Sequence, residues 1–200
     1  MTATAALPKS LPKSAPVPAK ATPKAISWTD FERKYLSRED RYKYEWVEGF
    51  IIKTLRTMNQ EQQFMLLNLE ALLDRLRPSN PALGKLLAEV DTFFGENHHR
   101  RPDIAYFSIE QIKAFRQTNQ IPLFVVEVIS TYDQQYKAYQ KLADYRRAEV
   151  PVVWHVFPKL QEVHVYRGKQ MTICTGEDSC SAEPVIPGFV LPIPAVFQQP

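Results

Sequence analysis

The run Leu123–Ser130, LFVVEVIS, constrains the fold of this chain more than any other stretch of its sequence. Its β-branched and aromatic residues are the types that pack the interior of a sheet. Two segments with helical spacing of apolar residues flank it, Asn59–Arg77 earlier in the chain and Tyr132–Arg147 directly after it. The run therefore predicts a buried strand in a sheet that helices cover.

The rest of the chain supplies further strands. A short helix is expected near Ser27, and a strand after the Gly49 turn passes through Ile51 and Ile52. The other predicted strands are Lys85–Phe94, Asp103–Phe107, Val152–Phe157, Val163–Tyr166 and Met171–Cys174. This order of helix, strands, helix and strands predicts an α/β (α+β) fold with a central mixed sheet flanked by helices.

The first residues differ in composition from the rest. Residues 1–25 contain five prolines, four lysines, no acidic residue and few large apolar side chains. Such a segment cannot build a core, so we expect a disordered tail followed by one domain over residues 26–200. Removing the four lysines changes the net charge from +3 to −1, so the folded part is nearly neutral. Net charge therefore gives little support for nucleic-acid binding.

Membrane insertion and disulfide scaffolds are not indicated. No apolar run approaches the roughly 20 residues of a membrane-spanning helix, and the N-terminus lacks the apolar core of a secretory signal. We therefore expect a cytoplasmic protein with no membrane partner. Cys174 and Cys180 are too few for a zinc site. Two reduced thiols are expected, with a single bridge across the Gly176 turn as the alternative.

One acidic residue, Glu127, interrupts the apolar run. An unpaired buried carboxylate is strongly disfavoured, and it takes up a proton, a cationic partner or a metal. Asp103 follows Pro102, which can open a strand but not lie inside a central one, so Asp103 falls near a strand end. If the two strands are neighbours, both carboxylates could converge on Mg²⁺ or Mn²⁺, which favour oxygen ligands. The alternative is an Asp in a turn and a Glu paired with a nearby Lys or Arg.

A lysine on the following helix could complete this group. On a helical wheel, a broad apolar arc is formed by Tyr132, Tyr136, Ala138, Tyr139, Leu142 and Tyr145. Lys141 falls at the edge of the arc, where it can bury its stem while its ammonium reaches the end of the preceding strand. A lysine on a solvated helix surface is the alternative.

Several motifs in a fixed order resemble one known family. The segments YEWVEGFII, RPDIAYF, VVEVIS, KLADYRRAEVPVVW, QEVHVYRG and IPGFVLPIPAVF follow one another between Tyr42 and Phe197. Together they resemble the Uma2 family, also called DUF820, of proposed restriction endonucleases. The resemblance implies a restriction-endonuclease-like core of the PD-(D/E)xK type, in which Asp103 and Glu127 hold the metal and Lys141 completes the catalytic set.

The same resemblance implies an activity and further candidate residues. It implies a Mg²⁺- or Mn²⁺-dependent endonuclease that hydrolyses DNA phosphodiester bonds. Glu45, in the YEWVEGFII segment, is either an additional ligand or an acid paired with Lys43 or Arg41. Lys137 occupies the position of a family acid one helical turn before Lys141, so either lysine could face the site.

Other departures from the family pattern leave a second function open. The family's Gly before the VxxW motif is Glu149 here. A catalytically weakened member that acts as a nucleic-acid-binding or oligomeric interaction module is the alternative to an active enzyme. Residues 98–101, HHRR, could contact phosphate beside the site or form a basic surface turn. His155 is expected to be packed, and His164 is expected to face solvent.

A homodimer is also expected. Nuclease folds of this type often pair to reach both strands of a duplex. The apolar residues expected to be exposed near the C-terminus are Phe189, Val190, Leu191, Ile193 and Phe197. We therefore expect this end of the chain to associate with a second copy.

Overall fold

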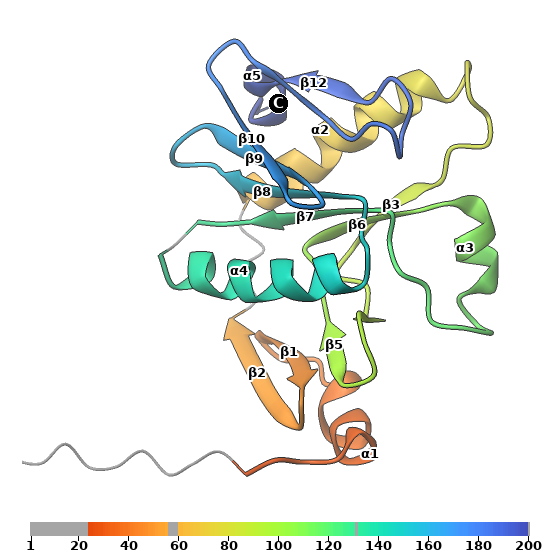
Figure 1. Cartoon of the computed structure of the whole chain (residues 1–200), viewed down its shortest axis with the longest axis vertical. Coiled ribbons are helices and arrows are strands. Elements are labelled where there is room, and N and C mark those ends of the chain that lie inside the picture. Colours follow the sequence, from red (N-terminus) through yellow and green to blue (C-terminus); the bar gives the residue numbers. More distant parts are fainter. Residues whose placement is uncertain (1–23, 56–59, 131, 200) are drawn as a thin grey trace, which may run out of the picture.

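The computed structural model describes residues 24–55, 60–130 and 132–199. The predicted tail over residues 1–25 lies almost entirely outside the described residues. Within the described ranges the strands form three sheets, which we name the large sheet, the small sheet and the C-terminal hairpin. Figure 1 shows the large sheet in the middle of the molecule, with the small sheet near the N-terminal end.

The large sheet has the spatial order β10-β9-β8-β7-β6-β3 among the described residues. Its strands are β3 (Lys85–Ala88), β6 (Ile104–Phe107), β7 (Phe124–Val128), β8 (Val152–Phe157), β9 (Glu162–Arg167) and β10 (Gln170–Thr175). β7 and β8 pair in parallel, and the other neighbours pair antiparallel. The predicted mixed sheet flanked by helices is therefore confirmed.

The two faces of β7 bury different side chains. Phe124, Val126 and Val128 belong to the larger core, which packs against α2 (Gln60–Leu76). Val125 packs in a second core beneath α4 (Tyr132–Arg147). Because side chains alternate along a strand, Glu127 lies on the α4 side with Val125. Figure 1 shows α4 on one side of the sheet and α2 on the other.

The C-terminal segment covers the same face as α2. It contains β11 (Ser179–Ser181), β12 (Val190–Pro192) and α5 (Ile193–Val196). Phe189, Leu191 and Ile193 are buried in the larger core. Their expected exposure, on which the homodimer prediction was based, is therefore wrong for these three residues, because they close the core over the sheet.

The small sheet has the order β2-β1-β5-β4 and lies against the N-terminal helices. Its strands are β1 (Tyr42–Val47), β2 (Phe50–Leu55), β4 (Thr92–Phe93) and β5 (His98–Arg100). The N-terminal helices are α1 (Trp28–Phe31) and η1 (Glu32–Leu36). The Ser27 side chain caps α1 by accepting the backbone N–H of Asp30 at 3.1 Å. Tyr44 and Trp46 pack with Phe31 in a separate aromatic core.

The predicted elements and the structure differ in several places. The strand predicted over Lys85–Phe94 is split, because Glu89 adopts a left-handed φ of 50° and sends β3 and β4 into different sheets. α3 (Ile109–Ala114), which begins at a Ser108 capping box, was not predicted. On α4, Tyr136 and Tyr139 are exposed rather than part of a buried apolar arc.

The two cysteines are free thiols. Cys174 and Cys180 are buried and not bonded to each other, and burial raises the pKa of Cys180 to about 12. Among the helices of the described ranges, none combines the length and apolar character that crossing a membrane would require.

Candidate active site

Asp103 and Glu127 meet across a strand pair at the rim of the large sheet. β6 and β7 are antiparallel neighbours in which Ile104 lies opposite Val126. Asp103 directly precedes β6, so continuing the register by one residue sets it opposite Glu127. One Asp103 oxygen accepts the backbone N–H of Val128 at 2.8 Å, which fixes the carboxylate at the rim.

α4 supplies the side chains that hold Glu127. The Lys141 ammonium lies 3.0 Å from both Glu127 oxygens, and the Tyr145 hydroxyl donates to Oε1 at 2.5 Å. Lys141 and Tyr145 are four residues apart on one helix and therefore project from the same face. All three side chains are buried, so these contacts form in a region of low dielectric constant.

Glu45 enters the site from β1 of the small sheet. Its Oε1 accepts the backbone N–H of Arg101 at 2.8 Å and lies 3.1 Å from the Lys141 ammonium. Its Oε2 lies 3.4 Å from the Arg100 guanidinium, whose Nε and Nη2 also lie 2.8 and 2.7 Å from one oxygen of Asp144, Oδ2. Lys141 is thus shared between Glu45 of the small sheet and Glu127 of the large sheet.

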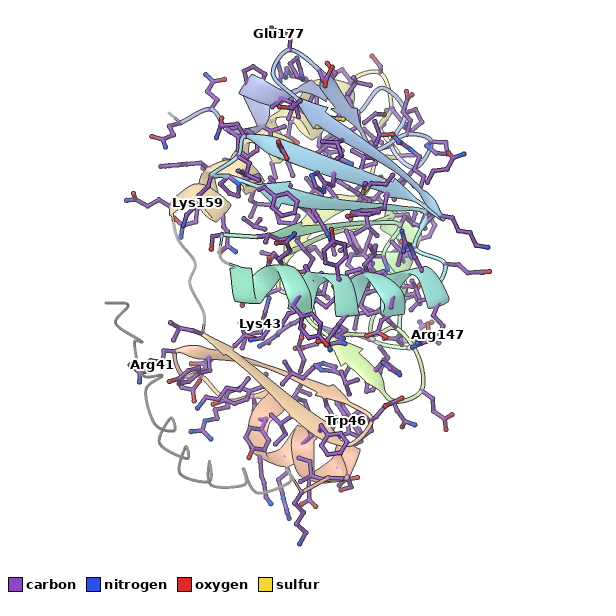
Figure 2. The ribbon with its side chains drawn as sticks, turned by 60° about the vertical axis from the view of Figure 1, so that its left-hand side comes forward. Arg41, Lys43, Trp46, Arg147, Lys159 and Glu177 are labelled. Atoms are coloured by element: carbon purple, nitrogen blue, oxygen red, sulfur yellow. The ribbon has the colours of Figure 1, made fainter. Side chains whose placement is uncertain are left out.

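Lys43 reaches the site from the same strand. It lies two residues before Glu45, so the two side chains share one face of β1 while Tyr44 and Trp46 face the aromatic core. Its ammonium is 2.8 Å from Asp103. Figure 2 shows Lys43 on the part of the small sheet near α4, away from the labelled Trp46. The sequence pattern indicated Lys43 only as a possible partner of Glu45, although its two-residue spacing from Glu45 on a strand signals a shared face.

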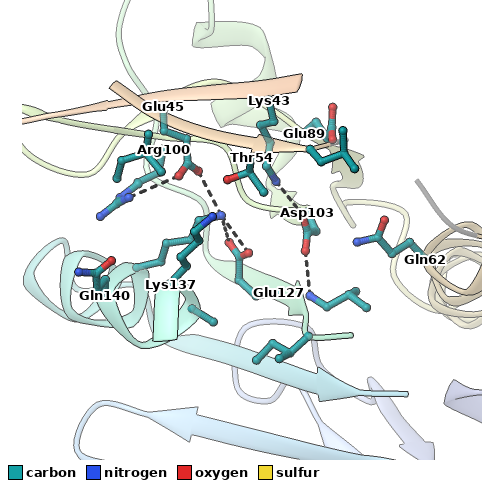
Figure 3. A pocket seen from close by; sticks show the side chains of 16 residues that line it. Lys43, Glu45, Thr54, Gln62, Glu89, Arg100, Asp103, Glu127, Lys137 and Gln140 are labelled. Carbon is teal, nitrogen blue, oxygen red and sulfur yellow. Dashed lines mark hydrogen bonds and ion pairs between the residues drawn. The ribbon is translucent and has the colours of Figure 1, made fainter. Parts of the chain in front are cut away.

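One pocket brings the five candidate residues together. Asp103, Glu127, Lys141, Glu45 and Lys137 all line it. Lys141 makes the ion pairs with Glu127 and Glu45, whereas Lys137 lies on the pocket wall with Gln140 (Figure 3). Lys141, and not Lys137, is therefore the lysine that contacts the carboxylates.

The buried charges shift one another's pKa values. Burial alone would raise the pKa of Glu45, but Lys141, Lys43 and Arg100, with the Arg101 N–H, lower it to about 2. Burial likewise opposes ionisation of Asp103, yet the attraction of Lys43 and Lys141 lowers its pKa.

Glu127 behaves differently from the other two carboxylates. Burial raises its pKa, and Lys141 only partly offsets that rise because Asp103 and Glu45 repel the ionised form. His155, its neighbour on β8, is buried as predicted, and burial with nearby cations lowers the pKa of His155 to about 3. His155 is therefore neutral and gives Glu127 no cationic partner. An added positive charge beside Glu127 would therefore favour its ionised form.

The segment His98–Arg101 was expected either to contact phosphate or to form a basic surface turn, and the structure shows a different arrangement. Arg100 and His99 are buried, and Arg100 is paired with Asp144 and Glu45. The Arg101 guanidinium and the His99 ring each lie 3.0 Å from Asp91. Arg100 and Arg101 thus pair with carboxylates within the protein, and neither a phosphate-contacting cluster nor a basic surface turn describes them. His164, expected to face solvent, is largely buried against the ring of Phe157.

The donor set of the pocket fits a hard divalent cation. Mg²⁺ is usually held by one or two carboxylates, with water and substrate phosphate as its other ligands. Asp103 and Glu127 match that set with oxygen donors alone. Among the residues that the structure describes, no group of three or more His, Cys, Asp or Glu side chains is arranged to hold a metal. A cation bound here would compete with Lys43 and Lys141 for the carboxylate oxygens.

Comparisons with known proteins agree with this architecture. The structure is similar to a crystal structure titled "putative nuclease belonging to DUF820" from Anabaena variabilis, with a TM-score of 0.68 and 19% sequence identity. The match covers 80% of this chain and 92% of that chain, and at this identity it supports the fold alone. Comparison with curated proteins finds no match. The profile of the Uma2 family, described as "Putative restriction endonuclease", matches residues 28–194. Since that match spans most of the sequence, this chain belongs to the Uma2 family.

Proposed function

We propose that this protein is a Mg²⁺- or Mn²⁺-dependent endonuclease that hydrolyses DNA phosphodiester bonds. The observation that carries the proposal is the convergence of Asp103 and Glu127 across the β6–β7 rim, with Lys141 in contact with Glu127. Two carboxylates and a lysine in one pocket are suited to phosphoryl chemistry, in which catalysis is mostly positioning and charge stabilisation. Membership of a family described as restriction endonucleases supports the choice of DNA.

Five residues of the pocket have roles in this proposal. Asp103 and Glu127 hold the metal, and a metal bound there supplies Lewis-acid polarisation of a phosphoryl oxygen. Lys141 offsets the negative charge that builds on the phosphate as the bond breaks. Glu45 keeps Lys141 and Arg100 in place through its two oxygens. Lys43, which is 2.8 Å from Asp103, is a second cation for binding phosphate.

The alternative function is a catalytically weakened member that binds nucleic acid or a partner chain. The observation in its favour is that both proposed ligands already have a lysine within 3.0 Å. Those pairs would have to open for a metal to bind. A cleavage assay decides between the two functions. Cleavage requires the carboxylates to hold a metal, whereas a binding module needs no metal ligands.

The test compares DNA cleavage by wild type, Glu127→Gln and Lys141→Met with Mg²⁺ or Mn²⁺. We expect both variants to lose cleavage by at least about a hundredfold, in keeping with the loss of a charge-stabilising group. Lys159→Met is the matched control because Lys159 is exposed and remote from the pocket (Figure 2). Wild type that cleaves DNA with neither metal would favour the binding module, whereas cleavage unchanged in Glu127→Gln would reject Glu127 as a metal ligand.

Two further parts of the proposal concern location and assembly. We propose a cytoplasmic protein that forms a homodimer. The support for a dimer now comes from β10, an edge strand of the large sheet with Met171 and Ile173 exposed. An exposed edge strand can pair with another chain. Light scattering that gives the mass of a single 23.1 kDa chain at every concentration would reject this part of the proposal.

A further inference from the structure

An apolar groove opens beside the catalytic pocket. It has a volume of about 320 Å³ and is lined by Leu66, Leu67, Ala88, Ile104 and Val128. It lies between the first turns of α2 and the rim formed by β3, β6 and β7. Leu67 is 56% exposed although it lines this concave surface. The volume falls within the range of sites that hold small organic groups.

The groove is continuous with the catalytic pocket. Asp103, Val128, Gln62 and Glu89 line both. Gln62 lies on the α2 side of Asp103 (Figure 3). A phosphate held near Asp103 therefore lies at the mouth of the groove. In a nucleic acid, the group nearest the phosphate that could fill an apolar groove is the base of the same or the next nucleotide.

The shape of the groove determines which base can enter. In a duplex each base is stacked between its neighbours and paired across the axis, so only its edges are exposed in the grooves of the DNA. A concave site between a helix and the rim of a sheet can receive only a base that has left the stack, as in enzymes that bind extruded bases or single strands.

We propose that this groove binds an unpaired nucleobase next to the scissile phosphate. The proposal rests on the nuclease function proposed above and specifies its substrate as DNA with an unpaired nucleotide at the cleavage site. The aliphatic walls formed by Leu66, Leu67 and Ile104 contact the base. Gln63 at the rim carries an amide that can donate to and accept from a base edge. A single strand and a base extruded from a duplex would present the same chemistry.

The test measures base binding rather than cleavage. Short DNA strands carry the fluorescent adenine analogue 2-aminopurine at successive positions, as single strands, as full duplexes and as duplexes with one unpaired nucleotide. Binding is measured in Ca²⁺, which shares the oxygen preference of Mg²⁺. We expect a position-specific fluorescence change with the single strand or the bulged duplex, and none with the full duplex. The relative signals of the first two identify the source of the base.

Variants assign the signal to the groove. Leu67→Lys places a charge in the groove, and Ala88→Phe fills it from an exposed position on β3. We expect each to weaken binding of the unpaired strand about tenfold, the order of one base–side-chain contact. Leu160→Lys is the matched control because Leu160 is 62% exposed and lies outside the groove.

The outcomes for the two proposals are distinguishable. Full duplex bound as tightly as unpaired DNA, or unchanged affinity in both groove variants, would overturn the base-binding proposal even if Mg²⁺-dependent cleavage persists. Groove variants that change only the oligomeric mass would assign the groove to a second chain and also overturn it. A position-specific fluorescence signal, together with cleavage that is unchanged in Glu127→Gln, would instead reject the proposed nuclease mechanism and leave the base-binding proposal standing.

Discussion

At the scale of single residues, the site is governed by unequal charges around one lysine. Lys141 is shared by Glu45 and Glu127, but the two carboxylates differ in their other neighbours. Glu45 also has Arg100 and a backbone N–H, whereas Glu127 faces repulsion from Asp103 and Glu45. Glu45 therefore stabilises the fold as an anion, and Glu127 is ionised at a cost. This difference is consistent with a structural role for Glu45 and supports the proposed metal-binding role of Glu127.

This difference predicts how stability depends on pH. The pKa of Glu45 falls from 4.5 to about 2 on folding, so ionised Glu45 contributes about 3 kcal/mol above pH 4.5, which is lost as the pH falls toward 2. The contribution of ionised Glu127 to stability has the opposite sign. Because its pKa is raised on folding, its ionisation lowers stability as the pH rises above 4.5. At pH 7 we expect Glu45→Gln to destabilise the protein by about 3 kcal/mol and Glu127→Gln by clearly less.

Urea unfolding of both variants at pH 7 and pH 3 checks this prediction. The difference between the variants should shrink at pH 3, where part of the contribution of Glu45 is already lost in wild type. Neither variant leaves an unpaired cation, since Lys141 keeps the other carboxylate and Arg100 keeps Asp144. A Glu127→Gln protein that loses as much stability as Glu45→Gln would contradict the assignment.

At the scale of elements, the position of β3 depends on one close approach of two backbone segments. Gly84 directly precedes β3, and a Cβ built on it would lie 1.8 Å from the carbonyl oxygen of Phe107. Its N–H donates to the Tyr106 hydroxyl at 2.8 Å. We expect Gly84→Ala to push β3 from β6 and to cost at least about 2 kcal/mol. Gly95→Ala, whose nearest neighbour would be 3.6 Å away, should cost under about 0.5 kcal/mol.

Thermal unfolding of the two alanine variants tests the anchoring of β3. Equal melting temperatures for Gly84→Ala and Gly95→Ala would show that β3 is not held by this contact. If Gly84→Ala is destabilised and Gly95→Ala is not, we also expect Gly84→Ala to bind an unpaired base more weakly, since Ala88 of β3 lines the groove.

The elements predicted from sequence were those with an apolar period. α2, β7 and β8 have apolar residues at regular spacing, and the structure has them where expected. β5 was missed because its His98, His99 and Arg100 resemble an exposed basic turn, while in the structure they are held by carboxylates from distant segments. Glu149, where the family has Gly, adopts a left-handed φ of 57°, which explains the family preference.

At the scale of the whole molecule, the site exists only where the two sheets meet. Asp103 and Glu127 come from the large sheet, Lys141 from α4, and Lys43 and Glu45 from the small sheet. Sequence spacing offered Asp103, Glu127 and Lys141 as one of two interpretations, and the resemblance to the Uma2 family implied the set; these residues lie on adjoining elements. It did not predict the contacts of Lys43 and Arg100, because those depend on how the small sheet packs over α4.

The central claim is that Asp103 and Glu127 together bind a divalent metal, and calorimetric titration with Mn²⁺ tests it most directly. Wild type should bind the ion, and Asp103→Asn should lose binding by at least tenfold because it removes a charged oxygen ligand. Asp74→Asn, an exposed site on α2, serves as the control and should bind like wild type. Binding that Asp103→Asn leaves unchanged, or no binding by wild type, would contradict the account.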